Sequence, residues 1–476
     1  MRFTEEQQKI IESANRNILV NAGPGMGKTT LLLGISKQYK YYNKKIICFN
    51  KIIEEEIKAK IVKEQIQYTT VNTFHSLAFN FFKNDNKYIK DFKYRDYDQP
   101  IDYFSISELL YKVYKENFDA NTINTIVELL EQYCTTNLSL KAFLEKKYLM
   151  DEKNTIDFYN KILNELIHFL MNNSFAPMFH SLYIKIFERI LFKKKAIIKT
   201  DMLLVDEFQD VNACFLSIIN SINSDVKIKV GDKMQSIYSY NGALGMDEHD
   251  LVLTKSFRIS EENAQLCNKI TKAVLNNEEY IIHGENKTQI IASEIIGKKT
   301  IIFRTNEYLI DTLLEETLQG KKCKISSNLL KNIKHAYKLA RIENTFLGYK
   351  YRNICFYTID DIKKYISLSN NKILKLALKF YEKYGNNIDE TFAIILNNIV
   401  ISDEYDIYLT TAHRCKGAEY DNVEIANDFP TISELIENKK NNKSFMNELC
   451  VIYVAITRSF NKMKLNKDLE WWWKNA

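Results

Sequence analysis

The chain has 476 residues, of which 46% are hydrophobic and 26% are charged. This balance is typical of a folded globular protein of roughly three domains, and it excludes long disordered tails, collagen-like repeats and fibrous classes. The net charge of +6 permits nucleic-acid binding without requiring it.

Neither the apolar segments nor the cysteines indicate a membrane or extracellular protein. No segment approaches the roughly 18 consecutive apolar residues that a membrane-spanning helix needs, and residues 1–6 are too acidic and polar for a signal peptide. The eight cysteines are widely spread and none forms a CxxC pair, so the sequence predicts no zinc cluster and no disulfide framework. We expect a reduced, cytoplasmic protein with no membrane partner.

The first part of the chain alternates short apolar strands with helical stretches. Strands are expected at 17–20, 45–49 and 69–71, each followed by a helix, which is the βαβ rhythm of a parallel sheet. Residues 76–198 are different, because apolar side chains recur there at helical spacing. This segment is predicted to be almost wholly helical.

Strand character returns further along the chain, at 202–205, 226–230 and 300–303 and then, after a second helical segment, at 407–409, 423–425 and 462–465. The pattern predicts an α/β fold with two cores, each interrupted by a helical insertion. The expected boundaries are 1–75 and 199–265 for the first core, 76–198 for its insertion, 266–306 and 404–476 for the second core, and 307–403 for a reduced second insertion.

The strongest local signal is the segment Ala-Gly-Pro-Gly-Met-Gly-Lys-Thr at 22–29, which follows a strand and precedes a helix. Glycines let backbone N–H groups converge on phosphates, and the helix N-terminus adds favourable partial charge. Lys28 is expected to reach the β- and γ-phosphates, and the Thr29 hydroxyl to bind Mg²⁺. The alternative is a glycine-rich turn before a helix, which does not account for the Lys-Thr pair in register.

A second signal is the apolar strand at 203–205 that ends in Asp206 and Glu207. Such strands place their carboxylates at the carboxyl edge of the sheet, where ligands bind. Asp206 is expected to hold Mg²⁺ and Glu207 to polarise the attacking water. Alone, this pattern also fits a solvated loop; its combination with Lys28 favours the nucleotide site.

Eight blocks of the sequence, in order, resemble the motifs of superfamily 1 helicases of the UvrD/Rep type. They are residues 3–7, 49–51, 73–75, 206–210, 230–238, 253–258, 410–420 and 453–458, in addition to the loop at 22–29. The wording Leu-Thr-x-Ser-Phe-Arg at 253–258 and Phe-Arg-Thr-Asn at 303–306 resembles the compact branch that contains the F-box DNA helicases, although no F-box is recognised here.

The resemblance implies two RecA-like P-loop NTPase cores that bind ATP with Mg²⁺. Gln7 would read the adenine edge, Phe257 would stack on the base and Glu419 would contact the ribose. The full set of implied nucleotide-binding residues is Gln7, Ala22, Gly23, Gly25, Gly27, Lys28, Thr29, Thr30, Phe257 and Glu419.

The resemblance also implies the residues that act on the γ-phosphate, namely Lys28, Asp206, Glu207, Gln235, Arg258 and Arg458. Gln235 would sense the γ-phosphate and couple it to DNA, while Arg258 and Arg458 would be arginine fingers. Guanidinium groups suit this role because negative charge spreads over the phosphoryl oxygens in the transition state. Since the two arginines are far apart in sequence, we expect the nucleotide to lie between the two cores.

Single-stranded DNA binding needs donors for phosphates and aromatic faces for bases. The candidates from the motif blocks are Phe49, Asn50, Lys51, Thr73, Phe74, His75, Tyr238, Tyr240, Thr411, His413 and Arg414. Burial in the core is an equal alternative for Phe49 and Phe74, and His75 could instead satisfy a buried backbone group. Tyr240 occupies the place of a base-stacking aromatic of the family.

Two features depart from the family pattern. In the family an arginine usually follows the aromatic residue of the motif at 230–238; Asn241 stands at that place here, which removes a cationic contact. The insertion at 307–403 is also short for the family. The three tryptophans, Trp471, Trp472 and Trp473, are consecutive, and they either pack on the second core or dock a partner.

The resemblance implies an ATP-dependent single-stranded DNA translocase and DNA helicase of 3′-to-5′ polarity. Its substrate would be single-stranded or tailed duplex DNA in repair, recombination or phage defence, with a nuclease as a possible protein partner. The alternative is a nucleotide-gated interaction module that recruits a nuclease or repair partner without productive unwinding.

Overall fold

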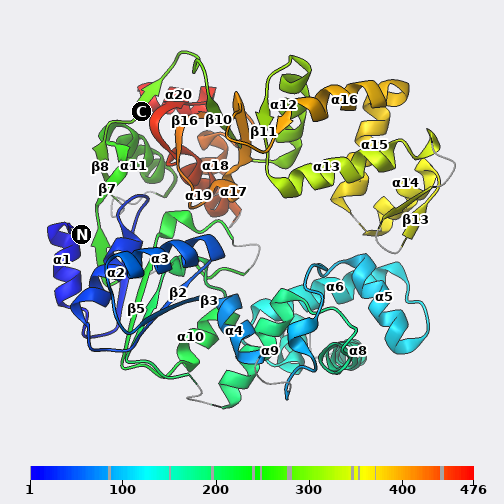
Figure 1. Ribbon diagram of the computed structural model, residues 1–476, viewed down its shortest axis with the longest axis horizontal. Coiled ribbons are helices and arrows are strands. Elements are labelled where there is room, and N and C mark those ends of the chain that lie inside the picture. The colour runs from blue at the N-terminus through cyan, green and yellow to red at the C-terminus, as the bar shows by residue number, and fades with distance from the viewer. Residues whose placement is uncertain are drawn as a thin grey trace. The chain divides into compact units, whose positions relative to one another are not determined.

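The computed structural model describes residues 2–83, 87–148, 152–194, 198–238, 242–246, 249–275, 281–344, 348–351, 354–369, 371–439 and 444–475. It forms two compact units (Figure 1). Unit 1 comprises residues 1–22 and 27–253, and unit 2 comprises residues 23–26 and 254–476. Both contain a parallel sheet flanked by helices, which confirms the predicted α/β class with two cores.

The sheet of unit 1 has six parallel strands in the order β3-β2-β4-β5-β1-β6. They are β1 (Ile18–Ala22), β2 (Lys44–Cys48), β3 (Thr69–Thr73), β4 (Met202–Val205), β5 (Val226–Gly231) and β6 (Leu251–Leu253). All four residues of β4 are buried, as the continuous apolar run of a central parallel strand requires. Because β1 and β4 are both central, their carboxyl ends bring distant parts of the sequence to one edge.

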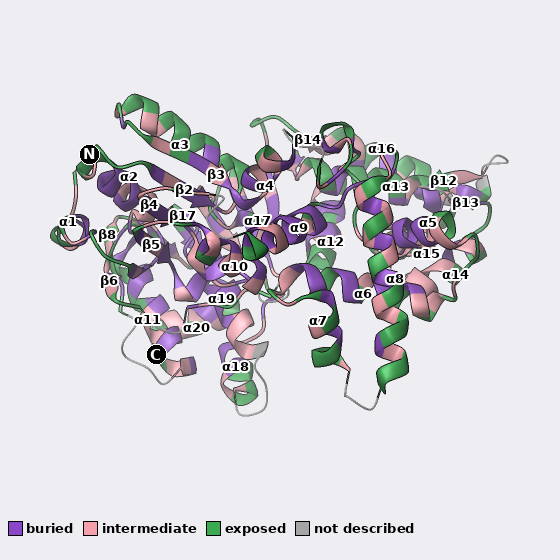
Figure 2. Ribbon diagram, turned by 90° about the horizontal axis from the view of Figure 1, so that it is seen from below, coloured by how far each residue is buried: buried purple, intermediate pink, exposed green. Residues whose placement is uncertain are grey.

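Helices that follow the strands complete this core. They are α1 (Glu5–Glu12), α2 (Lys28–Gln38), α3 (Lys51–Lys63), α4 (Phe74–Phe82) and α10 (Ala213–Ser221). Figure 2 shows α3 exposed along much of its length, and Glu54 and Ile57 are its buried residues.

The insertion of unit 1 is helical, as predicted. It contains the short 3₁₀ helix at Phe92–Tyr94 and the helices α5 (Tyr103–Tyr114), α6 (Ala120–Thr135), α7 (Leu140–Lys147), α8 (Lys153–Asn172) and α9 (His180–Lys193). Its core is continuous with that of the sheet, since α9 packs on both α4 and α10. The insertion and the first core thus share one hydrophobic interior.

The sheet of unit 2 has seven parallel strands in the order β14-β11-β15-β10-β16-β17-β9. They are β9 (Gln289–Ile291), β10 (Lys299–Phe303), β11 (Cys323–Lys324), β14 (Ile399–Val400), β15 (Ile407–Thr411), β16 (Tyr420–Ile425) and β17 (Ser459–Lys464). A separate parallel pair, β7 (Lys255–Ser260) and β8 (His283–Asn286), precedes this sheet in the chain. The flanking helices are α11 (Glu261–Leu275), α12 (Asn306–Leu318), α17 (Ala412–Cys415), α18 (Ile432–Asn438), α19 (Ser444–Ile456) and α20 (Lys467–Asn475).

The second insertion is narrower than the segment 307–403 suggested by the sequence, because α12, β11 and β14 belong to the sheet and its flanks. What remains is a small helical body with one antiparallel hairpin (Figure 1). It consists of α13 (Ser327–Ala340), β12 (Tyr349–Tyr351), β13 (Ile354–Phe356), α14 (Ile359–Ser369), α15 (Lys372–Tyr384) and α16 (Ile388–Asn398). In the part of the chain that the structure describes, no helix is long and apolar enough to cross a bilayer.

The tryptophan triplet lies on α20, which packs on α11. The indole Nε1 of Trp473 donates to Glu262 Oε1 at 3.0 Å, whereas Trp471 is 56% exposed. The tail therefore packs on the second core, the first of the two expected alternatives, and leaves one indole at the surface.

Helix α1 is held against α2 by a close approach at Gly34. A Cβ built on Gly34 would lie 2.7 Å from the Ile11 side chain and 2.7 Å from the Phe3 ring. The helix begins with a capping box in which Thr4 and Gln7 exchange hydrogen bonds. Gly34 thus sets the distance at which α1, and with it Gln7, lies from α2.

We predict that Gly34→Ala lowers the free energy of unfolding by about 1–3 kcal/mol, because the added methyl overpacks the α1–α2 contact. Helix propensity alone predicts the opposite sign, a gain of about 1 kcal/mol. Chemical denaturation of the variant and the unmodified chain distinguishes the two, and a more stable variant would contradict the close packing described here.

Candidate nucleotide site and nucleic-acid interface

The predicted phosphate-binding loop, residues 22–29, runs from the end of β1 into α2. Gly25 and Gly27 have φ values of +68° and +76°, a backbone conformation that residues with a side chain rarely adopt. Gly27 is also the N-cap of α2, and no side chain caps that helix end. The first-turn N–H groups of α2 therefore lie directly after a loop whose glycines allow close approach of an anion.

Two acidic residues at the end of β4 meet the two residues that follow the loop. The Thr29 hydroxyl donates to Asp206 Oδ2 at 3.0 Å, and Lys28 Nζ lies 3.8 Å from Glu207 Oε1. Lys28 Nζ also donates to the Ala22 carbonyl at 3.3 Å, and its side chain is only 10% exposed. These four predicted residues are brought together from segments 177 residues apart.

Burial sets the electrostatics of this cluster. Asp206 is 3% exposed, and desolvation, followed by repulsion from Glu207, raises its pKa to about 6. The Lys28 ammonium opposes this shift, as does the hydrogen bond from Thr29. Asp206 and Thr29 together present one carboxylate and one hydroxyl oxygen, the ligand type that Mg²⁺ prefers.

A buried network that the sequence did not assign connects Glu207 to Gln235. Gln209 Nε2 donates to Glu207, and Gln209 Oε1 accepts from the backbone N–H of Asp232 at 2.8 Å. Asp232 Oδ2 in turn accepts from Gln235 Nε2 at 2.7 Å. Gln209 and Asp232 are both completely buried. Their place inside the quoted motif blocks was the available signal, but their mutual contact depends on the pairing of β4 with β5.

The strand-to-loop junction at Glu207 has an unusual backbone. Glu207 has φ +51° and ψ +44°, the left-handed region that a residue with a Cβ adopts at a cost of about 1–2 kcal/mol. The 3₁₀ turn Phe208–Asp210 begins directly after it. This conformation turns the chain sharply, so that Glu207 and Gln209 both face the buried network.

Gln7 lies beside the phosphate loop. It is 3% exposed, and a Cβ built on Gly27 would lie 2.8 Å from Gln7 Nε2. Its Oε1 accepts from the Thr4 backbone N–H at 3.0 Å within the capping box. Thr30, the other predicted residue on this side, is half-buried on the first turn of α2. The capping box thus fixes the orientation of the Gln7 side chain.

In unit 2, two of the predicted nucleotide residues pair with each other. Arg258 Nε donates to Glu419 Oε1 at 2.7 Å, and the Arg258 side chain is 14% exposed. Arg458 is completely buried, and its Nε donates to the Val454 carbonyl at 2.8 Å. Burial raises the pKa of the Cys415 thiol to about 12, and the two arginines, Arg458 more than Arg258, act against this shift.

The tip of the phosphate loop, residues 23–26, groups with unit 2 through its contacts with β7. The Phe257 backbone N–H donates to the Gly25 carbonyl at 3.0 Å, and the Ser256 hydroxyl donates to the Pro24 carbonyl at 2.6 Å. The Phe257 ring itself is 54% exposed. A large exposed aromatic ring next to glycine backbone leaves a ring face available for stacking on a base.

The predicted DNA-contacting residues of unit 1 divide into surface and core positions. Phe49 is half-buried and stacks on Tyr238, with ring centroids 5.5 Å apart. Asn50 is exposed and caps α3 by accepting from the Ile53 N–H, and the exposed Lys51 lies 3.7 Å from Glu55. These residues form a polar and aromatic surface at the carboxyl ends of β2 and β5.

Phe74 and His75 lie deeper. Phe74 is 3% exposed and stacks on Phe215 with ring centroids 4.2 Å apart, so in this conformation it offers no free face to a base. Desolvation, with a smaller contribution from His180, lowers the pKa of His75 to about 4, and the ring packs against aromatic neighbours. Thr73 is buried and caps α4. For Phe74 the structure matches the core alternative.

The remaining candidates lie on β15 and α17 of unit 2, or outside the described residues. Thr411 is buried at the start of α17, His413 is half-buried and Arg414 is exposed. Tyr240 and Asn241 lie outside the described residues.

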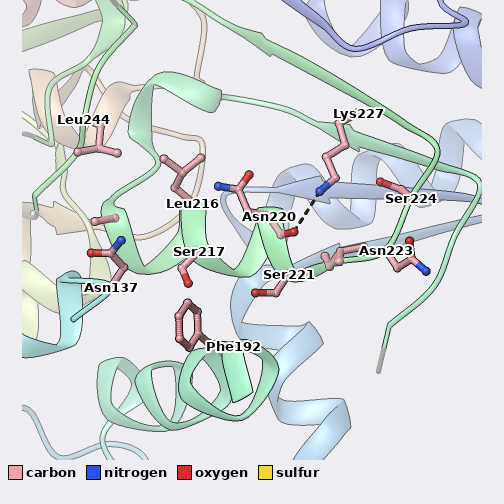
Figure 3. Close-up of a pocket in the computed structure, with 12 residues that line it drawn as sticks. Asn137, Phe192, Leu216, Ser217, Asn220, Ser221, Asn223, Ser224, Lys227 and Leu244 are labelled. Atoms are coloured by element: carbon pink, nitrogen blue, oxygen red, sulfur yellow. Dashed lines mark hydrogen bonds between the residues drawn. The ribbon is translucent and has the colours of Figure 1, made fainter. Parts of the chain in front are cut away.

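A cavity of about 770 Å³ lies beside α10, away from these groups (Figure 3). Figure 3 shows Lys227 reaching the end of α10, where its Nζ donates to the carbonyls of Ile219 at 3.0 Å and Asn220 at 3.3 Å. A lysine at this place satisfies the last carbonyls of the helix. None of the residues that line this cavity is a predicted site residue.

Residues 3–246 match the family of the UvrD/REP helicase N-terminal domain. The match covers more than half of the chain and all the predicted site residues that lie in unit 1.

The proteins to which this chain is similar are named DNA helicases. The chain is 24% identical to F-box DNA helicase 1 of Gallus gallus, over 99% of this chain and 49% of that protein. It is 25% identical to F-box DNA helicase protein 1 of Schizosaccharomyces pombe, over 98% and 58%, and 26% identical to the ATP-dependent DNA helicase Rep of Buchnera aphidicola, over 64% and 49%. The chain spans about half the length of the curated relatives it matches.

Proposed function

Because the chain belongs to the UvrD/REP helicase family, we propose that it is an ATP-dependent translocase on single-stranded DNA and a DNA helicase of 3′-to-5′ polarity. The observation that carries the proposal is the cluster of Lys28, Thr29, Asp206 and Glu207 at the carboxyl ends of β1 and β4. A nucleoside triphosphate with Mg²⁺ is the ligand that would contact the loop, the lysine and the two carboxylates at the same time.

The residues fit ATP and Mg²⁺. Lys28 and the N–H groups at the start of α2 would hold the phosphates, and Thr29 with Asp206 would hold the ion. Among the described residues no group of three or more His, Cys, Asp or Glu side chains could bind a metal. The ion would therefore depend on the nucleotide for further ligands, as Mg²⁺ does in phosphate-transfer sites.

Glu207 is the group that would orient water. Its Oε1 lies 3.8 Å from the Lys28 ammonium, so the two opposite charges are close together. Gln209 donates a hydrogen bond to the Glu207 carboxylate, and further hydrogen bonds lead from Gln209 to Asp232 and from Asp232 to Gln235. Hydrogen bonds thus connect Glu207 to Gln235, and Tyr238, a little further along the chain, stacks on Phe49.

Arg258 and Arg458 would supply positive charge to the phosphoryl group in the transition state. Arg258 is accessible in part and its partner Glu419 is half-exposed, so this ion pair is weak enough to exchange for a phosphate. Glu419, once released, is free to accept from a ribose hydroxyl. The substrate that we propose is single-stranded or tailed duplex DNA, in repair, recombination or phage defence.

The second candidate is a module that binds nucleotide to recruit a nuclease or repair partner. The exposed Trp471 favours it, since a large exposed aromatic is common at protein interfaces. The complete set of Lys28, Asp206 and Glu207 favours turnover instead. Stimulation of ATP hydrolysis by saturating single-stranded DNA supports the motor, and turnover that ignores DNA supports the module.

We predict that Lys28→Ala and Glu207→Gln each reduce DNA-stimulated ATP hydrolysis by about 10²–10⁴-fold, one by loss of phosphate charge and the other by loss of the water-orienting group. Glu207→Gln keeps nucleotide binding, because the amide oxygen still accepts the hydrogen bond from Gln209. The measurements are steady-state ATPase rates and fluorescent-nucleotide binding. A Glu207→Gln variant that no longer binds nucleotide would show that the residue holds the loop rather than the water.

Arg258→Ala is expected to lower the turnover number by about 10³-fold or more while changing nucleotide affinity little, because a finger acts on charge that develops in the transition state. Lys255→Ala is the matched control, since it removes an exposed cation from the same strand. The role assigned to Arg258 fails if the two variants hydrolyse ATP equally well.

Strand displacement tests polarity. With duplexes that carry a single-stranded tail on one side only, we expect unwinding from a 3′ tail and little from a 5′ tail. Equal unwinding of blunt and tailed duplexes, or displacement from the 5′ tail alone, would contradict the polarity. Lys28→Ala is the control for displacement that does not depend on hydrolysis.

A further inference from the structure

The strand β7, which carries Arg258, is irregular where it pairs with β8. Ser256 lies opposite Gly284 and Ser260 lies opposite Asn286, so a step of four residues along β7 matches a step of two along β8. An irregularity of this kind interrupts the ladder of backbone hydrogen bonds and changes the direction of the side chains within it. Arg258 is the middle residue of this stretch, so its backbone depends on partners outside a regular ladder.

The Arg258 carbonyl finds those partners in two side chains. Asn286 Nδ2 donates to it at 2.6 Å, and the Thr288 hydroxyl donates to it at 3.4 Å. Asn286 is half-buried and Thr288 is 3% exposed. Both residues belong to the connection between β8 and β9. Side chains of this connection, with the amide of Asn286 at the shorter distance, therefore hold the irregular part of β7.

The same amide also reaches β17. Asn286 Nδ2 donates to the Phe460 carbonyl at 3.1 Å, two residues after Arg458. An amide NH₂ group has two donors, so it can hold two carbonyls at once. The other end of the amide is held as well, because Asn286 Oδ1 accepts from the Lys287 N–H at 2.8 Å. Asn286 thus ties the backbone of Arg258 to the strand that follows Arg458.

The tip of the phosphate loop packs against the same residue of β7. A Cβ built on Gly25 would lie 2.8 Å from the Arg258 backbone nitrogen and even closer to the Arg258 Cβ. Gly25 also accepts a hydrogen bond from the Phe257 N–H at 3.0 Å. The loop tip and β7 belong to one compact unit. The place of the Arg258 backbone is therefore limited by Gly25 and fixed by the Asn286 amide.

We propose that Asn286 is a positioning residue for ATP hydrolysis, because its amide holds the Arg258 backbone to β17 and so sets where the Arg258 guanidinium can reach. The inference rests on the proposed function and deepens it, since it adds to the hydrolytic machinery a residue outside all the motif blocks. Asn286 acts through Arg258 and not on the nucleotide itself. A misplacement of about 1 Å can slow a reaction about 10²-fold. The loss of this amide should therefore lower turnover and leave nucleotide affinity nearly unchanged.

The test uses two variants of Asn286 in the full chain and one matched control. Asn286→Ala removes the amide, and Asn286→Asp keeps the size of the side chain but loses the donor. The control is Asn398→Ala at the end of α16. Asn398 is also half-buried, and its Nδ2 also bridges two carbonyls, those of Thr317 at 2.9 Å and Ile394 at 3.1 Å. It precedes β14, at the opposite edge of the sheet from β9.

Three measurements are made on each variant: single-turnover ATP hydrolysis with saturating oligothymidine, binding of a fluorescent nucleotide, and chemical denaturation. We expect both Asn286 variants to hydrolyse ATP about 10- to 10²-fold more slowly than the unmodified chain, with nucleotide affinity close to normal. Asn398→Ala should be destabilised to a similar degree and hydrolyse ATP at nearly the normal rate. This contrast separates positioning of Arg258 from a general loss of stability.

A double-mutant cycle with Arg258→Ala tests the route by which Asn286 acts. If Asn286 works through Arg258, adding Asn286→Ala to Arg258→Ala slows hydrolysis little further, because effects of residues that act as a unit are not additive. A full additional loss in the double variant would show that Asn286 acts elsewhere, and it would overturn the proposal.

Three other results also overturn the proposal. Normal hydrolysis by Asn286→Asp would show that the donor is not needed, and equal slowing by Asn398→Ala would show that stability alone matters. Weaker nucleotide binding at unchanged turnover would assign Asn286 to support of the phosphate loop. In each case, DNA-stimulated hydrolysis that is slowed by Arg258→Ala would leave the proposed function standing. An unmodified chain whose hydrolysis ignores DNA would instead overturn the proposed function, and this inference with it.

Discussion

The pairing of β4's two terminal carboxylates with Lys28 and Thr29 is the interaction on which the candidate site depends. Asp206 and Glu207 are placed in a largely buried setting, where an unpaired charge is strongly unfavourable. Removing one partner of a buried ion pair destabilises the fold more than replacing both partners with apolar residues, because the remaining charge is then buried without compensation. The loop, the helix start and the strand end are therefore constrained together, and none can shift alone.

A buried hydrogen-bond network continues outward from this cluster. Gln209 donates to Glu207 and accepts from the backbone N–H of Asp232, and the Asp232 carboxylate accepts from Gln235. A fully satisfied buried network of this kind fixes one arrangement of side chains. In unit 2 the ion pair of Arg258 with Glu419 is partly exposed and correspondingly easier to rearrange. In the proposed function, the rigid cluster of unit 1 would hold the phosphates and the more exposed ion pair of unit 2 would be free to rearrange.

Much of this was readable from the sequence because the signals are local. The glycine spacing before Lys28 and the apolar run before Asp206 each specify a short piece of backbone, and both pieces formed as predicted. The strands β11 and β14 were missed, since two residues each give no alternating pattern to recognise. Phe74 and Phe49 look alike in sequence, and only tertiary packing separates the core ring from the half-exposed one. The contact of Gln209 with Asp232 depends on strand order, which no local pattern encodes.

The left-handed backbone at Glu207 sets the stability of the fold against the catalytic role proposed for this residue. Glycine would adopt that conformation without steric penalty, and asparagine with less than most residues. Selection for a sturdier fold alone would thus drift away from glutamate at this position. The catalytic role proposed for Glu207 would explain why a carboxylate occupies a disfavoured dihedral angle. Thermostable versions of this protein are better sought elsewhere in the chain than at Glu207.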